Sequence, residues 1–198
     1  RFIQTFGPFN RFEMKFFAKK EFKKLDLIFA RGKETAFYCK QLIQAPEKVL
    51  DFPDIAILLK RADKTFTTKY LKNINFREKE YVIVSPSYVI YKQKKKVGLT
   101  TGKNYVRCFV DFCEEIIKKK LKIMFLPHTY GANIFSSDLG VCKEIIKALR
   151  EKKILKNYHL VDVDFDVRQA KALIASSNFA IVSRYHALVA ALSTGTPA

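Results

Sequence analysis

Residues 179–197 read FAIVSRYHALVAALSTGTP, and this stretch decides the fold. Its first four residues are an apolar run that predicts a short buried strand, and the run stops at Ser183. Ser183 is a residue type that caps helices, and residues 187–192 are apolar on nearly every face, as in a buried helix. Gly195 followed by Pro197 is a typical helix end. A buried strand leading directly into a buried helix is the unit from which α/β proteins are built.

The same alternation of strand and helix recurs along the 198 residues. Apart from 179–182, we expect strands at 2–6, 25–30, 49–59, 81–86, 122–126 and 160–164, and helices at 12–24, 34–44, 105–117, 137–149 and 166–176. This order predicts an α/β fold with Rossmann-like parallel sheets. Residues 60–80 are polar, basic and weakly patterned, which favours a connection between domains. We therefore predict residues 1–66 as the C-terminal part of a truncated α/β domain, and residues 67–198 as a second, Rossmann-like domain truncated at its C-terminus.

The formal net charge is +18, from 37 basic and 19 acidic residues. Such an excess is typical of proteins that bind nucleic acid or anionic membranes. The lysines, however, are scattered through expected helices and loops, and no nucleic-acid recognition motif accompanies them. We interpret most of this charge as solvated surface and expect no nucleic-acid partner. Attraction of anionic substrates, or of an anionic membrane surface, remains the alternative.

The sequence lacks the motifs of several common types of functional site. The four cysteines form no CxxC pair, so we expect reduced thiols and a cytoplasmic protein. The alternating aspartates at 162–166 fit strand ends and a helix cap, and we predict no metal site. No phosphate-binding P-loop, GxGxxG turn or GxSxG elbow is present, which argues against a P-loop NTPase, a dinucleotide enzyme and an α/β-hydrolase.

Arg184 and His186 stand between the last expected strand and its helix, where α/β proteins bind ligands. In an extended backbone, residues two apart point to the same side, so both side chains are expected to face one pocket. The helix that follows adds its positive N-terminal end. Together these groups suit a phosphate or carboxylate ligand. The alternative is a structural arginine paired with Asp162 or Asp164, beside a histidine with a purely structural partner.

Three further residues, one arginine and two histidines, lie at or near strand ends. Arg31 ends a strand just before a helix, which is a second position suited to phosphate, although an ordinary surface arginine would look the same. His128 follows the strand 122–126 and precedes a turn with Gly131, so it is either a pocket residue or a loop histidine. His159 is expected at the start of a strand, opposite the usual ligand edge, and is discounted.

Taken in order, these motifs resemble the polysaccharide pyruvyl transferase family over essentially the whole chain. The segments that carry the resemblance are QTFGP (4–8), LIFAR (27–31), PDIA (53–56), LPH (126–128), SD (137–138), ASSNF (175–179), SRYHA (183–187) and GTP (195–197). The family's Arg-Leu-His is here Arg184-Tyr-His186, and its Arg-Asp-x-x-Ser is Arg31-Gly-Lys-Glu-Thr35. The second departure leaves Thr35 without an assigned role.

The resemblance implies a GT-B-like two-domain architecture with the active site in the cleft between domains. It implies transfer of the pyruvyl group of phosphoenolpyruvate to sugar hydroxyls of a surface polysaccharide or its precursor, forming a ketal and releasing phosphate. In that reaction Arg184 and Arg31 are expected to bind the anionic donor. His186 is expected to transfer a proton. We assign substrate-binding roles to four other residues: His128, Ser183, Gly195 and Thr196.

The resemblance requires no cofactor and no metal, with phosphoenolpyruvate as the donor substrate. The expected partners are this donor and a sugar or lipid-linked oligosaccharide acceptor, with peripheral association at the inner face of the membrane as an extension of the cytoplasmic prediction. Two alternatives stay open. One is a GT-B-type glycosyltransferase that uses a nucleotide sugar, and the other is a non-enzymatic module that binds anions or RNA.

Overall fold

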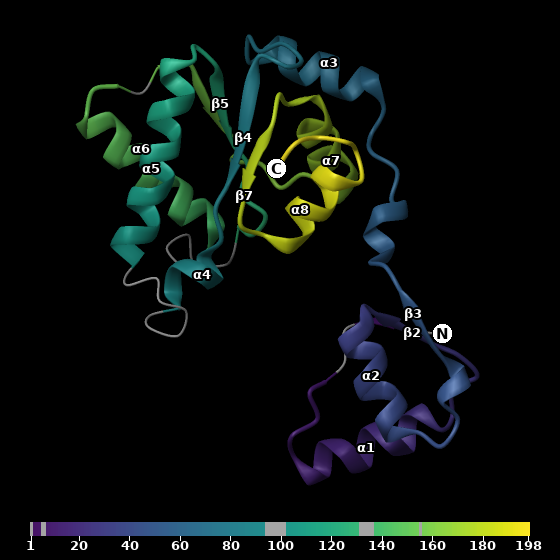
Figure 1. Cartoon of the computed structure of the whole chain (residues 1–198). Coiled ribbons are helices and arrows are strands. Elements are labelled where there is room, and N and C mark those ends of the chain that lie inside the picture. Colours follow the sequence, from purple (N-terminus) through teal and green to yellow (C-terminus); the bar gives the residue numbers. More distant parts are fainter. Residues whose placement is uncertain (1, 5–6, 94–101, 131–136, 155) are drawn as a thin grey trace. The chain divides into compact units, whose positions relative to one another are not determined.

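The computed structural model of the chain describes residues 2–4, 7–93, 102–130, 137–154 and 156–198 (Figure 1). The last two residues of the strand expected at 2–6, and Gly131 in the turn after His128, lie outside these ranges. By its internal contacts the chain divides into two compact units, residues 1–58 and 59–198.

The first unit is a three-stranded parallel sheet with two helices. The strands are β1 (Phe2–Gln4), β2 (Ile28–Arg31) and β3 (Val49–Phe52), in the order β1-β2-β3. Helices α1 (Phe12–Phe22) and α2 (Lys33–Leu42) join them, and a turn of 3-10 helix, Ile55–Leu58, replaces the last part of the strand expected at 49–59. The core of this unit contains Ile28 and Ala30 of β2, which are fully buried.

The second unit is a four-stranded parallel sheet in the order β6-β5-β4-β7. Its strands are β4 (Tyr81–Ser85), β5 (Lys122–Phe125), β6 (Tyr158–Leu160) and β7 (Ala180–Val182). Its helices are α3 (Lys64–Asn73), α4 (Tyr88–Lys92), α5 (Gly102–Lys118), α6 (Asp138–Glu151), α7 (Val167–Ser176) and α8 (Tyr185–Leu192).

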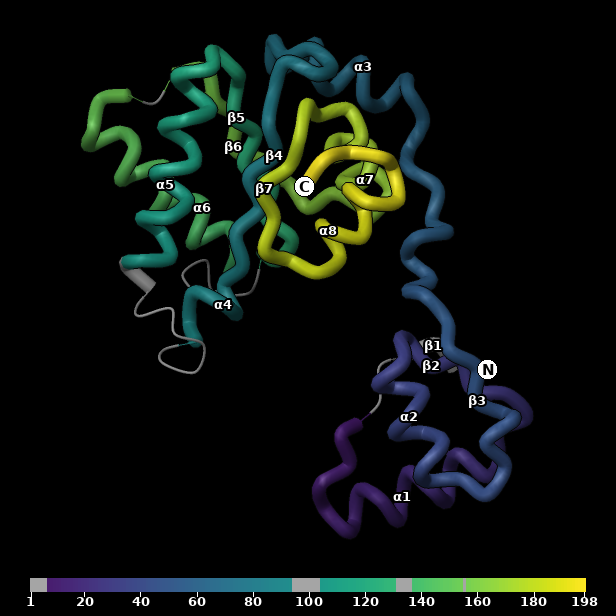
Figure 2. Tube along the Cα trace, in the orientation of Figure 1, coloured from purple at the N-terminus to yellow at the C-terminus, as the bar shows by residue number. Residues whose placement is uncertain are grey.

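Helices cover both faces of this sheet, so the central strand is buried throughout and is apolar up to its last residue, Ser85. Val82 and Val84 of β4 pack in the core formed with α5 and α6, whereas Tyr81 and Ile83 pack on the side of α3, α7 and α8 (Figure 2). All five residues of β4 are buried, as expected of a central strand in a doubly covered parallel sheet. The predicted α/β class with parallel, Rossmann-like sheets is confirmed.

The strand order fixes where a ligand is expected. From β4 the chain steps outward to β5 and β6, and then returns to place β7 on the other side of β4. The connections leave β4 and β7 in opposite directions, and the carboxyl ends of two such strands are where open α/β sheets bind ligands. Ser85 and Ser183 stand at this point.

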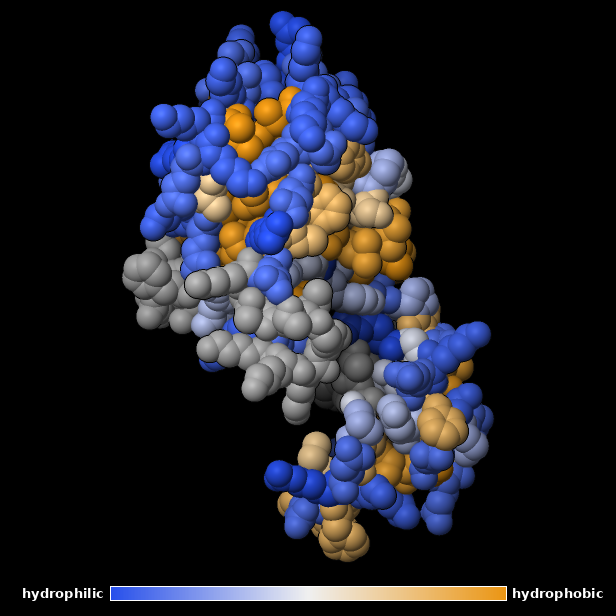
Figure 3. Space-filling view, turned by 60° about the vertical axis from the view of Figure 1, so that its left-hand side comes forward, coloured by the Kyte–Doolittle hydropathy of each residue, from blue (hydrophilic) through white to orange (hydrophobic). Residues whose placement is uncertain are grey.

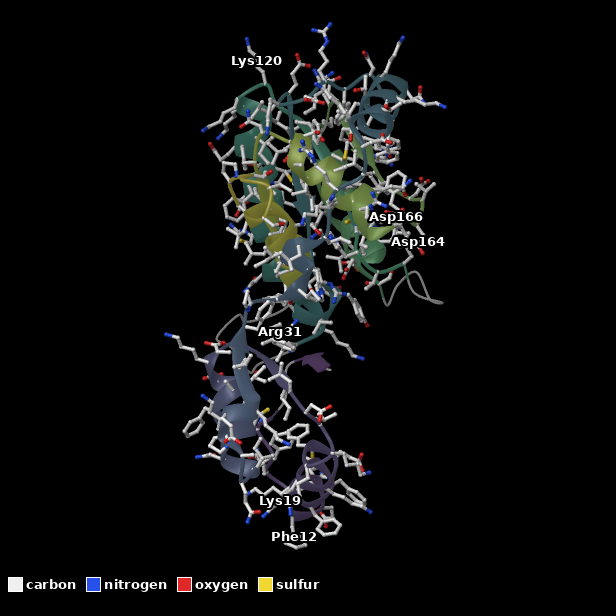
Figure 4. The ribbon with its side chains drawn as sticks, turned by 90° about the vertical axis from the view of Figure 1, so that its right-hand side faces the viewer. Phe12, Lys19, Arg31, Lys120, Asp164 and Asp166 are labelled. Carbon is white, nitrogen blue, oxygen red and sulfur yellow. The ribbon has the colours of Figure 1, made fainter. Side chains whose placement is uncertain are left out.

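Two predicted elements are wrong in position. The stretch 60–80, predicted as a connection, contains helix α3, which buries Leu71 in the core of the second unit. The N-cap of this helix is Asp63, whose carboxylate accepts a hydrogen bond from the Phe66 amide. The strand expected at 160–164 is β6, at 158–160. It ends early because the aspartates that follow stay in water, and Figure 4 shows Asp164 at the surface of the second unit.

The start of α8 is also wrong in the prediction, whereas its end is confirmed. The N-cap is Arg184, not Ser183, and the helix begins at Tyr185. At the other end Gly195 adopts a φ of 69°. Its amide and that of Thr196 donate to carbonyls of the last helical turn, which is the Schellman pattern that glycine favours.

The surface shown in Figure 3 is predominantly hydrophilic, with separate apolar patches. Most of the lysines that the structure describes are exposed and contribute to this hydrophilic surface. None of the helices in the described ranges combines the length and the apolar character needed to cross a bilayer.

Candidate active site

The centre of the site is an ion pair between Arg184 and Asp138. The Nε and Nη2 atoms of Arg184 each donate to one carboxylate oxygen of Asp138, and both distances are 2.8 Å. The Asp138 side chain is completely buried, whereas 24% of the Arg184 side chain is exposed. A two-pronged contact of this kind fixes the plane of the guanidinium. The buried aspartate therefore fixes the orientation of the arginine, while part of the arginine side chain stays exposed to solvent.

Thr129 and Tyr88 complete the support of this pair. The hydroxyl of Thr129 accepts from Arg184 Nη2 at 3.1 Å and from the Asp138 amide at 3.1 Å. The Tyr88 amide donates to Asp138 Oδ1 at 2.7 Å. Ser137 caps α6 by accepting from the Gly140 amide, so Asp138 stands in the first turn of that helix, where a carboxylate is favoured. These contacts offset the cost of burying the carboxylate.

The structure corrects two parts of the sequence interpretation of Arg184. Its acidic partner is Asp138 and neither Asp162 nor Asp164, which are exposed. The argument that Arg184 and His186 share a side because they are two apart in a strand is also wrong, since α8 begins at Tyr185. His186 is instead an exposed residue in the first turn of α8, with its ring edge-on to that of Tyr185 at 5.6 Å.

His128 approaches the same edge of the sheet from the end of β5. Its Nδ1 lies 3.0 Å from the hydroxyl of Ser85, the fully buried last residue of β4. Burial lowers the pKa of His128 below its ordinary value, and the positive charges of Arg184 and His186 act in the same direction. A hydrogen bond with the Leu126 backbone and the charge of Asp138 oppose that shift. The net result favours a neutral ring.

Ser183 is a structural partner of Ser85 rather than a cap. Its amide donates to the Ser85 carbonyl at 3.0 Å, which ties the ends of β7 and β4 together. Its hydroxyl forms a short hydrogen bond with the phenol of Tyr105, and that phenol accepts from the Ser87 amide at 2.8 Å. Burial raises the pKa of Tyr105, so it stays a neutral phenol. This network fixes the carboxyl ends of β4 and β7 relative to each other.

Arg31 has a matching environment in the first unit. It is the last residue of β2, and its Nη1 donates to Asp54 Oδ2 at 2.7 Å. The exposed fractions of the two side chains are 28% for Arg31 and 6% for Asp54. The other carboxylate oxygen accepts from the Ala56 amide at 2.9 Å. Figure 4 labels Arg31, which is again a strand-end arginine held by a buried aspartate.

Gly195 and Thr196 lie at the opposite end of α8 from Arg184. Thr196 is buried, and its hydroxyl donates to the Ile174 carbonyl at 3.2 Å and contacts the Thr194 hydroxyl at 3.1 Å. His159, discounted above, bonds Tyr70 through its Nε2 at 2.7 Å. The residues that the structure gathers at the carboxyl edge of the second sheet are Ser85, Thr129, His128, Asp138, Ser183, Arg184 and His186.

A family match decides the broader identity. Residues 4–198 match the family described as "Polysaccharide pyruvyl transferase". The chain belongs to the polysaccharide pyruvyl transferase family. The resemblance inferred from its motifs is thereby confirmed, and the protein is a transferase with a role in pyruvyl transfer to polysaccharide. Among curated proteins, none matches the chain.

Sequence reasoning missed several groups that shape this pyruvyl transferase site. The sequence analysis names Asp138 only within the SD segment (137–138) of the family resemblance and gives it no role in the site, and it does not single out Ser85, Thr129 or Tyr105. The available signal was the position of Ser85, since the last residue of a central strand faces the ligand edge. Within the described ranges, no group of three or more histidine, cysteine, aspartate or glutamate side chains is arranged to hold a metal ion.

Proposed function

We propose that this pyruvyl transferase uses phosphoenolpyruvate as its donor and forms a pyruvate ketal on a sugar, with release of phosphate. The observation that carries the proposal is Arg184, held by the buried carboxylate of Asp138 at the N-terminal end of α8. A guanidinium oriented in this way presents fixed donors to a carboxylate or phosphate. The donor has both groups, so this site suits it.

The charge balance supports an anionic ligand. Asp138 neutralises Arg184, but the first-turn amides of α8 and its dipole add positive potential at the same place. His186 stands in that first turn and is exposed to solvent. An anion bound by Arg184 would therefore also meet the start of α8.

We assign His186 the role of acid. Ketal formation requires that the methylene carbon of the donor gains a proton, which leaves an oxocarbenium-like carbon for attack by a hydroxyl. Histidine is the side chain that enzymes use most often to give or take a proton in catalysis. The scheme needs neither a metal nor a further cofactor. Arg31, in the first unit, is a second candidate for binding an anionic group of a substrate.

The acceptor class and the location of the protein are part of the proposal. The acceptor is a sugar of a surface polysaccharide or of its precursor, including a lipid-linked oligosaccharide, and the reaction takes place in the cytoplasm at the inner face of the membrane. Helix α1 supports peripheral contact, because Phe12, Phe16 and Phe17 expose 80%, 56% and 61% of their surface. Residues 11–24 carry six basic and two acidic side chains, which complement anionic lipid.

A direct test offers the full-length protein phosphoenolpyruvate together with a panel of p-nitrophenyl glycosides of hexoses and N-acetylhexosamines. The expected product carries the mass of one pyruvate less one water, and inorganic phosphate appears in equal amount. Parallel reactions with UDP- and GDP-sugars test the glycosyltransferase alternative. Glycosyl transfer from a nucleotide sugar, with phosphoenolpyruvate left intact, would overturn the proposal. Arg184→Ala is the matched inactive control.

A further inference from the structure

The first step of the proposed reaction needs a proton acceptor and an acid at the same time, and His186 supplies only the acid in that step. We infer that His128 is the second proton-transfer residue, which accepts the proton of the attacking sugar hydroxyl. This inference rests on the proposed function and adds a catalytic residue to it. It follows from the place of His128 at the switch-point edge of the sheet and from the way its ring is held.

The ring of His128 is oriented by a buried partner. Ser85 Oγ lies 3.0 Å from Nδ1, and Ser85 is fully buried at the end of the central strand. The Ser85 backbone is fixed in turn, since its carbonyl accepts from the Ser183 amide at 3.0 Å. With Nδ1 engaged in this way, Nε2 is the nitrogen that we assign to the substrate. A base fixed through its second nitrogen is a recurring arrangement in catalytic sites.

The surroundings of His128 keep it neutral, as a base must be. Burial is the main cause of its lowered pKa, and the charges of Arg184 and His186 add to the effect. Asp138 and the Leu126 backbone act against it. His186, in contrast, is exposed at the start of α8. Two titratable groups in such different environments are suited to opposite roles in proton transfer.

With these roles the reaction balances over two steps. First, His128 takes the proton of one sugar hydroxyl as that oxygen bonds to C2 of the donor, and protonated His186 gives a proton to C3, which becomes a methyl carbon. Next, the bond from C2 to the phosphate oxygen breaks and the second hydroxyl oxygen bonds to C2. His186 takes the proton of this hydroxyl, while His128 returns its proton to the departing phosphate. A diol and phosphoenolpyruvate thus give a cyclic ketal and hydrogen phosphate, and both histidines regain their starting states.

The test compares His128→Asn and His128→Gln with the wild-type enzyme. The asparagine amide can replace Nδ1 beside Ser85 but provides nothing at Nε2, whereas glutamine reaches toward Nε2 without being able to carry a proton. We expect both variants to lose about 10²- to 10⁴-fold in kcat, as for removal of a general base. The KM for phosphoenolpyruvate should stay within about threefold, since the donor is bound by Arg184. The acidic limb of the pH profile of kcat/KM should disappear in both.

Each outcome decides the role of His128. Wild-type kcat in His128→Asn would overturn it, and so would a lower kcat with an unchanged acidic limb, because a structural role would not remove that limb. Thermal melting of each variant identifies a folding defect, and Ser85→Ala then serves as a second probe, with an expected loss of about tenfold in kcat and an intact KM. If wild-type enzyme itself makes no ketal from phosphoenolpyruvate, the proposed function fails. If wild type is active and independent of His128, only this inference fails.

Discussion

Asp138 is completely buried and binds Arg184 through both of its carboxylate oxygens, each at 2.8 Å. The two residues are 46 positions apart in the chain and belong to α6 and the start of α8. The pair therefore joins two helices at the ligand edge of the sheet. It also determines what the arginine can offer a substrate, because the atoms bound to Asp138 are no longer free to rotate.

The first prediction concerns Asp138→Asn. The amide keeps the size of the side chain but turns one acceptor into a donor opposite Arg184, and it leaves the guanidinium without its buried counter-charge. We expect the free energy of unfolding to fall by about 2–4 kcal/mol, below the upper range for buried pairs because Arg184 is partly exposed. Urea titration measures this change. Asp111→Asn, at an exposed position on α5, is the control and should change stability by less than about 0.5 kcal/mol.

The second prediction separates charge from geometry at Arg184. Lysine keeps the positive charge but cannot bind Asp138 with two parallel donors or present a planar fork to an anion. For Arg184→Lys we expect kcat/KM for phosphoenolpyruvate to fall about ten- to a hundredfold, corresponding to the loss of a charged hydrogen bond. Arg168→Lys, on the exposed side of α7, should leave it unchanged. An unaltered kcat/KM in Arg184→Lys would contradict the role of Arg184 in binding the donor.

The sequence largely predicts the fold, whereas it does not predict which residues of the site are hydrogen-bonded to each other. A short apolar run identifies β4, and apolar residues at helical spacing identify α5. Both signals lie within the element itself, so they can be recognised without knowing what the element packs against. The partner of Arg184 is a long-range property, and Asp138 had a sufficient local explanation in the first turn of a helix that Ser137 caps. The start of α8 at Tyr185 could not be predicted either. Ser183 is a residue type that often caps helices, but its hydroxyl is hydrogen-bonded to Tyr105 instead.

The third prediction concerns Arg31 and Asp54. If Arg31 binds an anionic group of a substrate, Arg31→Ala raises the KM for the donor or for the acceptor by about tenfold, the loss of one charged hydrogen bond. Asp54→Asn should give a smaller rise, since the arginine is retained but loses its buried partner. Asp51→Asn, exposed on β3, is the control. Steady-state kinetics with each substrate varied in turn make the measurement, and unchanged KM values for both would leave Arg31 a structural residue only.

The fourth prediction tests α1 as a membrane contact. Replacing Phe12, Phe16 and Phe17 by serine removes exposed aromatic surface while leaving the lysines in place. We expect co-sedimentation with vesicles of anionic phospholipid to fall at least about fivefold, and wild-type binding to weaken with salt. Phe112→Ser, at an exposed phenylalanine on α5, should retain binding. The prediction is wrong if the wild-type protein does not co-sediment with the vesicles. If, in addition, the triple variant changes only in oligomeric state or solubility, α1 contacts another protein surface and not lipid.

The last prediction follows from the burial of His128. Burial lowers its pKa in the folded protein, so the unfolded chain binds a proton near pH 6.5 while the folded protein does not until a lower pH. This residue therefore leaves stability intact above about pH 6.5 and reduces it as pH falls toward the folded-state pKa. Urea unfolding at about pH 7.5 and about pH 5.5 should show a steeper loss in wild type than in His128→Asn. Equal losses in the two proteins would mean that the pKa of His128 is the same in the folded and the unfolded chain, and that its burial does not disfavour the charged ring.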